Sequence, residues 1–209
     1  MNIQHNVETG LFCLTTDNSL YQMKADSAGV LLHLYYGKKL SGDMSYLIRH
    51  MDRGFSGNPY DQRFNRGYSL DTLPQEYSGN GVGDFRLPAL QVMSSNGSRS
   101  VELRYAGCEI SKGRAPLPAL PFVRDADDAE SLEITLKDGV SGLAVKLFYH
   151  VYPRYDVIVR SARIVNEGND TLNVLKAASV CLDFPYQTYD ALHFPGRHCM
   201  ERTTERISL

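Results

Sequence analysis

The sequence has 209 residues, 43% of them hydrophobic and 22% charged, a composition typical of a folded globular chain with one large domain or two small ones. The 22 lysines and arginines and the 24 acidic residues leave a net charge of −2, which argues against a nucleic-acid-binding surface. No stretch approaches the roughly 18 apolar residues of a membrane span, and the first residues lack the pattern of a signal peptide, so we expect no membrane partner and a cytoplasmic location.

Short strands are predicted in the N-terminal third of the chain. Apolar runs at Leu11–Leu14, Leu20–Lys24 and Val30–Tyr36 are separated by turn residues, as is typical of antiparallel strands. Met44–His50 is the only candidate for a helix, and it is long enough for two turns at most.

A long segment without a convincing strand follows, from Asp52 to Pro88. It contains six aromatic residues and four arginines but no lysine. Disordered linkers are poor in aromatic residues. Because a loop of 37 residues is also too long for an ordinary connection, we interpret residues 52–88 as an ordered, functional loop that contacts another molecule or domain.

The second half of the chain predicts a meander of antiparallel strands. Val101–Tyr105 is a short strand, and apolar and polar residues then alternate with period two in four further segments. These are Leu132–Lys137, Leu143–Tyr152, Val157–Asn166 and Leu172–Phe184. The first two are joined through Asp138 and Gly139, which are typical hairpin residues. The sequence therefore predicts an all-β fold, and its length suggests a sandwich of large sheets.

Common catalytic and cofactor motifs are missing. The sequence has neither the G-x-S-x-G motif of hydrolases nor the H-E-x-x-H motif of zinc enzymes. The glycine cluster Gly79–Gly83 follows no apolar strand and opens no amphipathic helix, so we interpret it as a turn. His193, His198 and Cys199 lack a closed four-ligand spacing. We therefore expect neither a metal nor another cofactor.

The four cysteines are scattered along the sequence. They contain no C-x-x-C pair, and they stand at Cys13, Cys108, Cys181 and Cys199. In a chain of this length such spacing favours reduced structural thiols over a disulfide framework.

The carboxylates allow two interpretations. Glycoside hydrolysis needs two carboxyl groups across a sugar, but the sequence alone selects no pair. The acidic run from Asp125 to Glu130 is typical of a solvated turn. Asp52, Asp71 and Asp84 lie beside arginines in the long loop, where they either bind sugar hydroxyls or form internal ion pairs.

Five blocks, in order along the chain, carry a family resemblance. They are LHLYYGKKL (Leu32–Leu40), DRGFSGNP (Asp52–Pro59), YSLDTLPQEY (Tyr68–Tyr77), GDFRLPAL (Gly83–Leu90) and SLEITL (Ser131–Leu136). Together they resemble the N-terminal domain of the bacterial α-galactosidases of glycoside hydrolase family 36. The block from Leu192 to Arg202 is similar to the family's exit from this domain, although the chain has His198 where many members carry tryptophan.

The resemblance implies a fold and a domain order. Residues 1–209 are expected to form a β-supersandwich of the galactose mutarotase type, followed in the parent enzyme by a (β/α)₈ barrel that begins after Leu209. The family removes terminal α-galactose from sugars such as melibiose and raffinose by a retaining mechanism, with both catalytic aspartates on the barrel. We therefore expect no catalytic residue in this chain and no activity from the chain alone.

The resemblance also implies a role for the long loop. Many family members are tetramers in which loops of the N-terminal domain form a wall of a neighbouring subunit's active-site pocket. By position in the matched blocks, the candidates for substrate binding are Asp52, Arg53, Phe55, Asn58, Arg66 and Tyr68. Asp52 and Arg66 would bind sugar hydroxyls, and Phe55 would supply an apolar face.

Two other functions remain open from the sequence. One is a free-standing carbohydrate-binding module, although the chain contains no tryptophan to serve as a sugar platform. The other is a structural domain whose arginine-rich and aromatic loop forms an oligomer interface.

Overall fold

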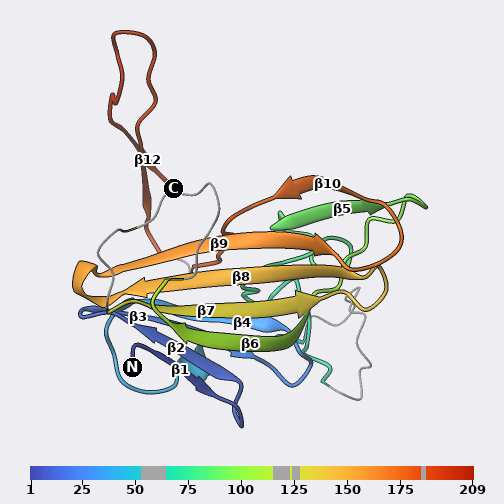
Figure 1. Cartoon of the computed structure of the whole chain (residues 1–209). Helices are drawn as coiled ribbons and strands as arrows, with labels where there is room; N and C mark the ends of the chain where they lie inside the picture. The colour runs from blue at the N-terminus through green and yellow to red at the C-terminus, as the bar shows by residue number, and fades with distance from the viewer. Residues whose placement is uncertain (53–64, 115–122, 124–127, 185–186) are drawn as a thin grey trace.

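Two four-stranded antiparallel sheets form the body of the molecule (Figure 1). The computed structural model describes residues 1–52, 65–114, 123, 128–184 and 187–209. The first sheet has the order β1(Ile3–Asn6), β2(Leu11–Thr15), β3(Ser19–Ala25) and β4(Leu31–Lys38). The second has the order β6(Arg104–Lys112), β7(Glu130–Lys137), β8(Leu143–Tyr152) and β9(Val157–Asn166). Both sheets are meanders of neighbouring strands, so the all-β sandwich expected from the sequence is confirmed.

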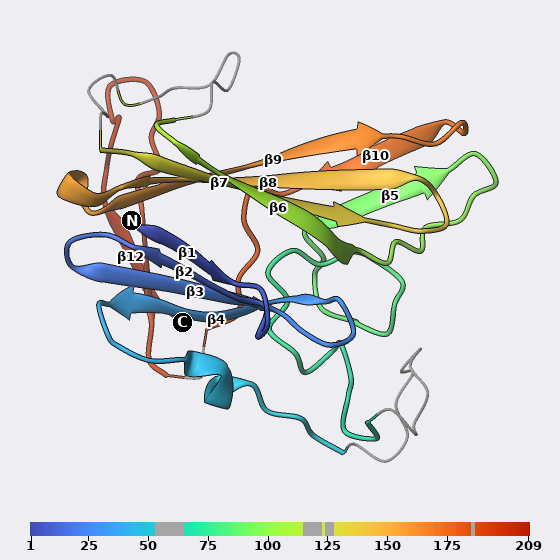
Figure 2. The ribbon, with the colours of Figure 1, turned by 60° about the horizontal axis from the view of Figure 1, so that its bottom comes forward.

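The core lies between the two sheets, which face each other in Figure 2. Alternate residues of β7 and β8 point inward, and they pack against Ile3, Phe12, Leu14 and Met23 of the first sheet. The inward residues include Leu132, Ile134 and Leu136 from β7, and Val145, Leu147, Tyr149 and Val151 from β8. This is the set of apolar positions that the period-two pattern assigned to one face.

Two smaller strand pairs complete the described fold. β5(Leu90–Ser94) pairs with β10(Leu172–Ala177), and this pair lies beside β9 in Figure 1. β11(Asp190–His193) pairs with β12(Glu205–Ser208) in a hairpin that projects away from the sandwich. The segment from Ala178 to Phe184, here called the crossing segment, leads from β10 towards this hairpin across the open side of the sandwich.

Several element boundaries differ from the sequence predictions. The strand expected at Val101–Tyr105 begins only at Arg104 and runs to Lys112, because Val101 and Leu103 fill the core from an irregular segment. The strand expected from Leu172 to Phe184 ends at Ala177, where the chain turns into the crossing segment. Strands β1, β5, β11 and β12 were not predicted. Each is only four or five residues long and contains at most three apolar residues, whereas the equally short β2 (LFCLT) has four in a row.

The helix expected at Met44–His50 is a single 3₁₀ turn, η1(Met44–Leu47). Asp43 caps it by accepting a hydrogen bond from the Ser45 amide, and Ile48 is already extended. A second 3₁₀ turn, η2(Pro153–Tyr155), joins β8 to β9. In the part of the chain that the structure describes, no helix has the length and apolar character needed to cross a membrane.

The turn after β5 allows a clean test of backbone conformation. Gly97 has φ +84° there, and a Cβ added to it would meet no atom within 4 Å. We expect Gly97→Ala to lower the free energy of unfolding by about 1–2 kcal/mol, the cost of a left-handed conformation for a residue with a Cβ. Chemical denaturation measures this change in the free energy of unfolding. Gly139→Ala is the matched control, because Gly139 also has open space but no left-handed backbone. Equal effects of the two variants would contradict the conformational explanation.

Candidate functional site

A buried carboxylate, Glu76, is the centre of a polar network between the two sheets. The Glu76 side chain is fully buried. Its Oε1 accepts hydrogen bonds from the hydroxyls of Tyr21 and Tyr149, both at 2.7 Å, and pairs with Arg160 Nη1 at 2.6 Å. Oε2 lies 3.2 Å from Nδ1 of His33. The network therefore places a compensated ion pair inside a mainly apolar core.

Four strands and one loop position these groups. Tyr21 and His33 come from β3 and β4 of the first sheet, and Tyr149 and Arg160 from β8 and β9 of the second. Glu76 itself lies in the long loop, whose backbone is fixed along β4. The His33 amide donates to the Pro74 carbonyl at 2.7 Å, and the Glu76 amide donates to the Leu31 carbonyl at 2.9 Å.

Burial and charge act in opposite directions on the network. Burial by itself raises the pKa of Glu76, but attraction to Arg160 and contact with His33 and Tyr149 outweigh burial, so the pKa of Glu76 is lowered. Burial and then the Glu76 carboxylate raise the pKa of Tyr21 and of Tyr149 well above the ordinary value. The carboxylate is therefore ionised and the tyrosines neutral. Glu76 Oε1 is engaged by Tyr21, Tyr149 and Arg160, and Glu76 Oε2 has the His33 ring nitrogen beside it, so we assign Glu76 a structural role.

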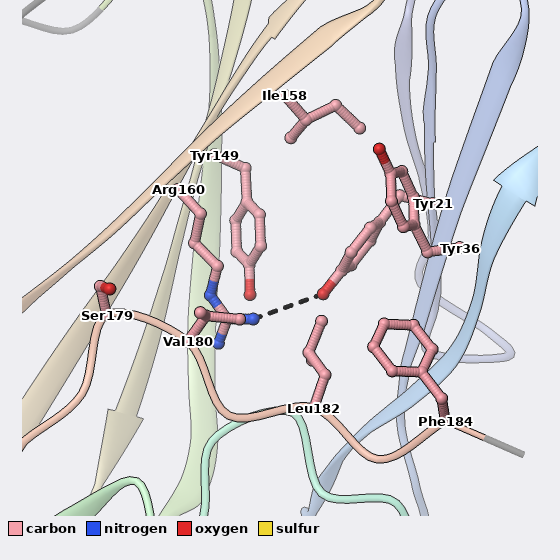
Figure 3. A pocket seen from close by; sticks show the side chains of 9 residues that line it. All are labelled: Tyr21, Tyr36, Tyr149, Ile158, Arg160, Ser179, Val180, Leu182 and Phe184. Carbon is pink, nitrogen blue, oxygen red and sulfur yellow. Dashed lines mark hydrogen bonds between the residues drawn. The ribbon is translucent and has the colours of Figure 1, made fainter. Parts of the chain in front are cut away.

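A pocket of about 480 Å³ opens in front of this network (Figure 3). Figure 3 shows the Tyr21, Tyr149 and Arg160 side chains converging from opposite sheets, with Arg160 Nη1 3.4 Å from the Tyr21 hydroxyl. The crossing segment closes one side of the pocket. The remaining lining side chains are mostly apolar and are Tyr36, Ile158, Ser179, Val180, Leu182 and Phe184.

Arg86 organises the described end of the long loop. Its guanidinium donates to both carboxylate oxygens of Asp84, to the carbonyls of Leu70 and Leu73 at 2.8 and 2.7 Å, and to Asp183 at 2.6 Å. Burial lowers the pKa of Arg86, but Asp84 and Asp183 raise it more, so the net shift is upward. At Arg86 and Asp84, the internal ion pair is thus the interpretation that the structure supports.

The predicted substrate-binding residues lie in two environments. Asp52 and Arg66 form an ion pair, with Arg66 Nε 2.9 Å from Asp52 Oδ2, and both side chains are about half exposed or more. Tyr68 is instead 2% exposed. Its hydroxyl donates to Asp26 Oδ2 at 2.8 Å, and its ring stacks on His50. Arg53, Phe55 and Asn58 lie outside the described residues. The structure thus brings Asp52 and Arg66 together at the surface and places Tyr68 beneath it.

Sequence reasoning missed the roles of Glu76 and Arg160. A signal for Arg160 was present, because it occupies the same face of β9 as Ile158, Ala162 and Ile164, which pack against the core. A charged residue on the apolar face of a strand indicates a buried partner. Glu76 gave no comparable signal, because it lies in an irregular segment where periodicity carries no information.

Comparison with known proteins identifies clear relatives. Residues 29–209 match the model of the glycosyl hydrolase family 36 N-terminal domain. The chain is 45% identical over its whole length to the bifunctional alpha-galactosidase/sucrose kinase AgaSK of Mediterraneibacter gnavus, and 41% identical to alpha-galactosidase AgaA of Geobacillus stearothermophilus. It spans only 22% and 29% of the lengths of these two relatives.

Solved structures agree with these matches. The galactosidase domain of AgaSK superimposes with a TM-score of 0.93 over 99% of this chain and 29% of that one. A variant of AgaA from Geobacillus stearothermophilus in complex with raffinose gives a TM-score of 0.88 at 42% identity, over 95% of this chain and 28% of that one. The fold described above is therefore that of the first part of much longer proteins.

Proposed function

The chain belongs to the N-terminal domain family of glycosyl hydrolase family 36, and from this membership we propose that it is the pocket-lining and assembly domain of an α-galactosidase. The full-length protein would hydrolyse terminal α-galactose from sugars such as raffinose by a retaining mechanism. Its catalytic carboxylates would lie on a (β/α)₈ barrel beyond residue 209. The observation that carries this proposal is the match of the whole chain to the start of the galactosidase domain of AgaSK.

The geometry of the chain supports a contributory role. Glu76 is sealed in the core, and Asp84 is bound by Arg86 and by the Gln75 amide at 2.8 Å. Retaining hydrolysis requires two carboxyl groups about 5 Å apart across a sugar. Neither Glu76, which is buried in the core, nor Asp84, which is held by Arg86 and Gln75, is placed to meet a sugar, which fits a catalytic pair on another domain.

An activity assay tests the proposal. We expect the full-length protein to hydrolyse an aryl α-galactoside, and the 209-residue chain to show no turnover while its circular dichroism spectrum remains rich in β-structure. Turnover by the chain alone that disappears when one of its aspartates is changed to asparagine would contradict the proposal. Sugar binding by the chain with no activity in the full-length protein would favour a carbohydrate-binding module.

We propose that Asp52 and Arg66 contact substrate hydroxyls from the exposed surface of the loop, with Tyr68 supporting that surface from below and with Arg53, Phe55 and Asn58 completing the wall. In the full-length protein, Asp52→Ala or Arg66→Ala should raise KM about tenfold, the loss of one charge-assisted hydrogen bond of about 1.5 kcal/mol. Steady-state kinetics measures the change.

A matched control separates substrate binding from folding. Arg206 and Asp190 form another exposed ion pair, in the β11–β12 hairpin. We expect Asp190→Ala to leave KM within about twofold, because an exposed ion pair contributes little by itself. The melting temperature should hardly change in any of these variants. Unchanged KM in both loop variants would remove Asp52 and Arg66 from the site.

We further propose that the full-length protein is a homo-oligomer in the cytoplasm. All four cysteines of the chain are unpaired, which is consistent with a reducing compartment. The tetramer expected from the family resemblance is tested by light scattering of the full-length protein.

A further inference from the structure

An apolar face lies beside β4, the edge strand of the first sheet. Five large hydrophobic side chains on it are between 40% and 54% exposed, and they form what is here called the docking face: Tyr36, Leu47, Met51, Val180 and Phe184. They line two adjoining hollows. One is the 480 Å³ pocket in front of Arg160, and the other is a groove of about 830 Å³ that shares Tyr36 and Phe184 with it. Soluble proteins seldom leave such a contiguous patch open to water.

The backbone beside this face is also open. β4 is the last strand of its sheet, and on its outer side Leu32 makes an isolated bridge to Gln75. Among the described residues, no strand continues the sheet beyond Leu34–Lys38 of β4. An uncovered edge beside exposed apolar side chains favours association, and proteins usually cover such edges. The docking face thus has the properties of a surface that another domain or molecule covers.

The rim of the face is polar. Arg49, Arg86 and Asp183 line the larger groove together with the apolar side chains. An apolar centre within a polar rim is the usual anatomy of a specific interface. A domain interface within one chain follows the same rules.

The path of the chain indicates which part of the protein covers the docking face. The amide of Leu209 donates to the carbonyl of Tyr189 at 2.9 Å, and Tyr189 lines the larger groove, with its ring 6.1 Å from that of Phe184. Residue 209 is therefore held at the rim of the docking face. The solved relatives extend far beyond the part that this chain matches, since the match covers 29% of the galactosidase domain of AgaSK. A partner tethered at the rim has a high effective concentration there.

We infer that the domain that follows residue 209 packs against the docking face, and that an apolar side chain of that domain fills the pocket between Tyr36, Val180 and Phe184. Because the Arg160 charge is compensated by Glu76, the pocket favours a neutral group. This inference rests on the proposed function, which supplies the following domain.

Hydrogen exchange tests the inference on the unmodified proteins. We expect the amides of residues 179–184 to exchange about tenfold or more slowly in the full-length protein than in the 209-residue chain. Equal exchange rates would overturn the inference. Protection in the 209-residue chain that increases with its concentration would also overturn it, because the occupant would then be a second copy.

A pair of variants provides an independent measurement. Val180→Asp should lower the melting temperature of the full-length protein by several degrees and that of the 209-residue chain by less than about 1 °C. Val140→Asp is the control, because Val140 is 97% exposed in the loop between β7 and β8 and should change neither. Equal shifts from Val180→Asp in both proteins would count against the docking face.

The activity assay distinguishes the two proposals. Full-length protein that hydrolyses an aryl α-galactoside but leaves residues 179–184 unprotected would refute the docking face and retain the function. Full-length protein that protects residues 179–184 but lacks that activity would refute the function and retain the docking face.

Discussion

Glu76→Gln is expected to lower the free energy of unfolding by about 3–5 kcal/mol, because it leaves the Arg160 guanidinium buried without its counter-charge. Glutamine has nearly the same shape and can still accept hydrogen bonds from Tyr21 and Tyr149, so the loss reports mainly on charge. Chemical denaturation of the wild-type and variant chains, followed by circular dichroism, measures the difference.

The control for this variant is an exposed ion pair of the same chemistry. Glu167 accepts a hydrogen bond from Lys137 at 2.7 Å, and both side chains are more than 40% exposed. Glu167→Gln should therefore cost less than about 1 kcal/mol. If the two variants are equally stable, the buried pair contributes no more than a surface pair, and the structural role assigned to Glu76 is wrong.

The contribution of Glu76 should also depend on pH. Its pKa in the folded chain lies below the ordinary value of 4.5. A lowered carboxyl pKa stabilises the folded state fully at pH values above the unfolded pKa, and this stabilisation is lost as the pH falls through the folded pKa. The stability difference between wild type and Glu76→Gln should therefore be constant above about pH 5 and shrink below it. A difference that grows on acidification would contradict the direction of the pKa shift.

Arg86→Lys is expected to lower the free energy of unfolding by about 2 kcal/mol, because a single ammonium group cannot reach all the acceptors that the guanidinium joins. The arginine connects Leu70, Leu73 and Asp84 in the loop to Asp183 in the crossing segment. Asp84 is only 4% exposed, so part of its hydrogen bonding would be lost inside the protein.

Arg154→Lys is the matched substitution. Arg154 donates to Asp128 from an exposed position at 3.0 Å, and we expect its replacement to change stability by less than about 0.5 kcal/mol. Denaturation curves compare the two variants, and limited proteolysis should cut near residues 70–73 faster in Arg86→Lys alone. Equal stability of the two variants would show that the stability of the long loop does not depend on the several hydrogen bonds of the Arg86 guanidinium.

The sequence predicted the sheets better than the loop, for a physical reason. In β7, the residues that face the other sheet, Leu132, Ile134 and Leu136, alternate with more exposed ones, so burial imposes an alternation that can be read directly. β8 is buried along nearly its whole length, and only its inward face is consistently apolar. The long loop is held by side-chain donors and single backbone contacts, which leave no periodic trace. Its arginines and aspartates were therefore recognisable as polar partners, whereas the particular pairing of Arg86 with Asp84 required coordinates.

The candidate site was predictable only in part. The pairing of Asp52 with Arg66 was one of two interpretations of acidic residues beside arginines. The family resemblance implied a substrate-binding role for Tyr68 by position, but it could not show that Tyr68 is buried with its hydroxyl on Asp26 and its ring against His50. Local patterns do not encode such contacts between distant segments.

The Glu76 network also has a consequence for the rate at which the chain folds. Each four-stranded sheet is a meander of neighbouring strands, so hairpins within a sheet can form early from local contacts. Glu76 instead joins partners 55, 73 and 84 residues away in Tyr21, Tyr149 and Arg160. These contacts require large loops to close, and an ion pair gains most only after water has left the space around it. We therefore expect the network to form after the transition state, so that its loss accelerates unfolding and leaves the folding rate nearly unchanged.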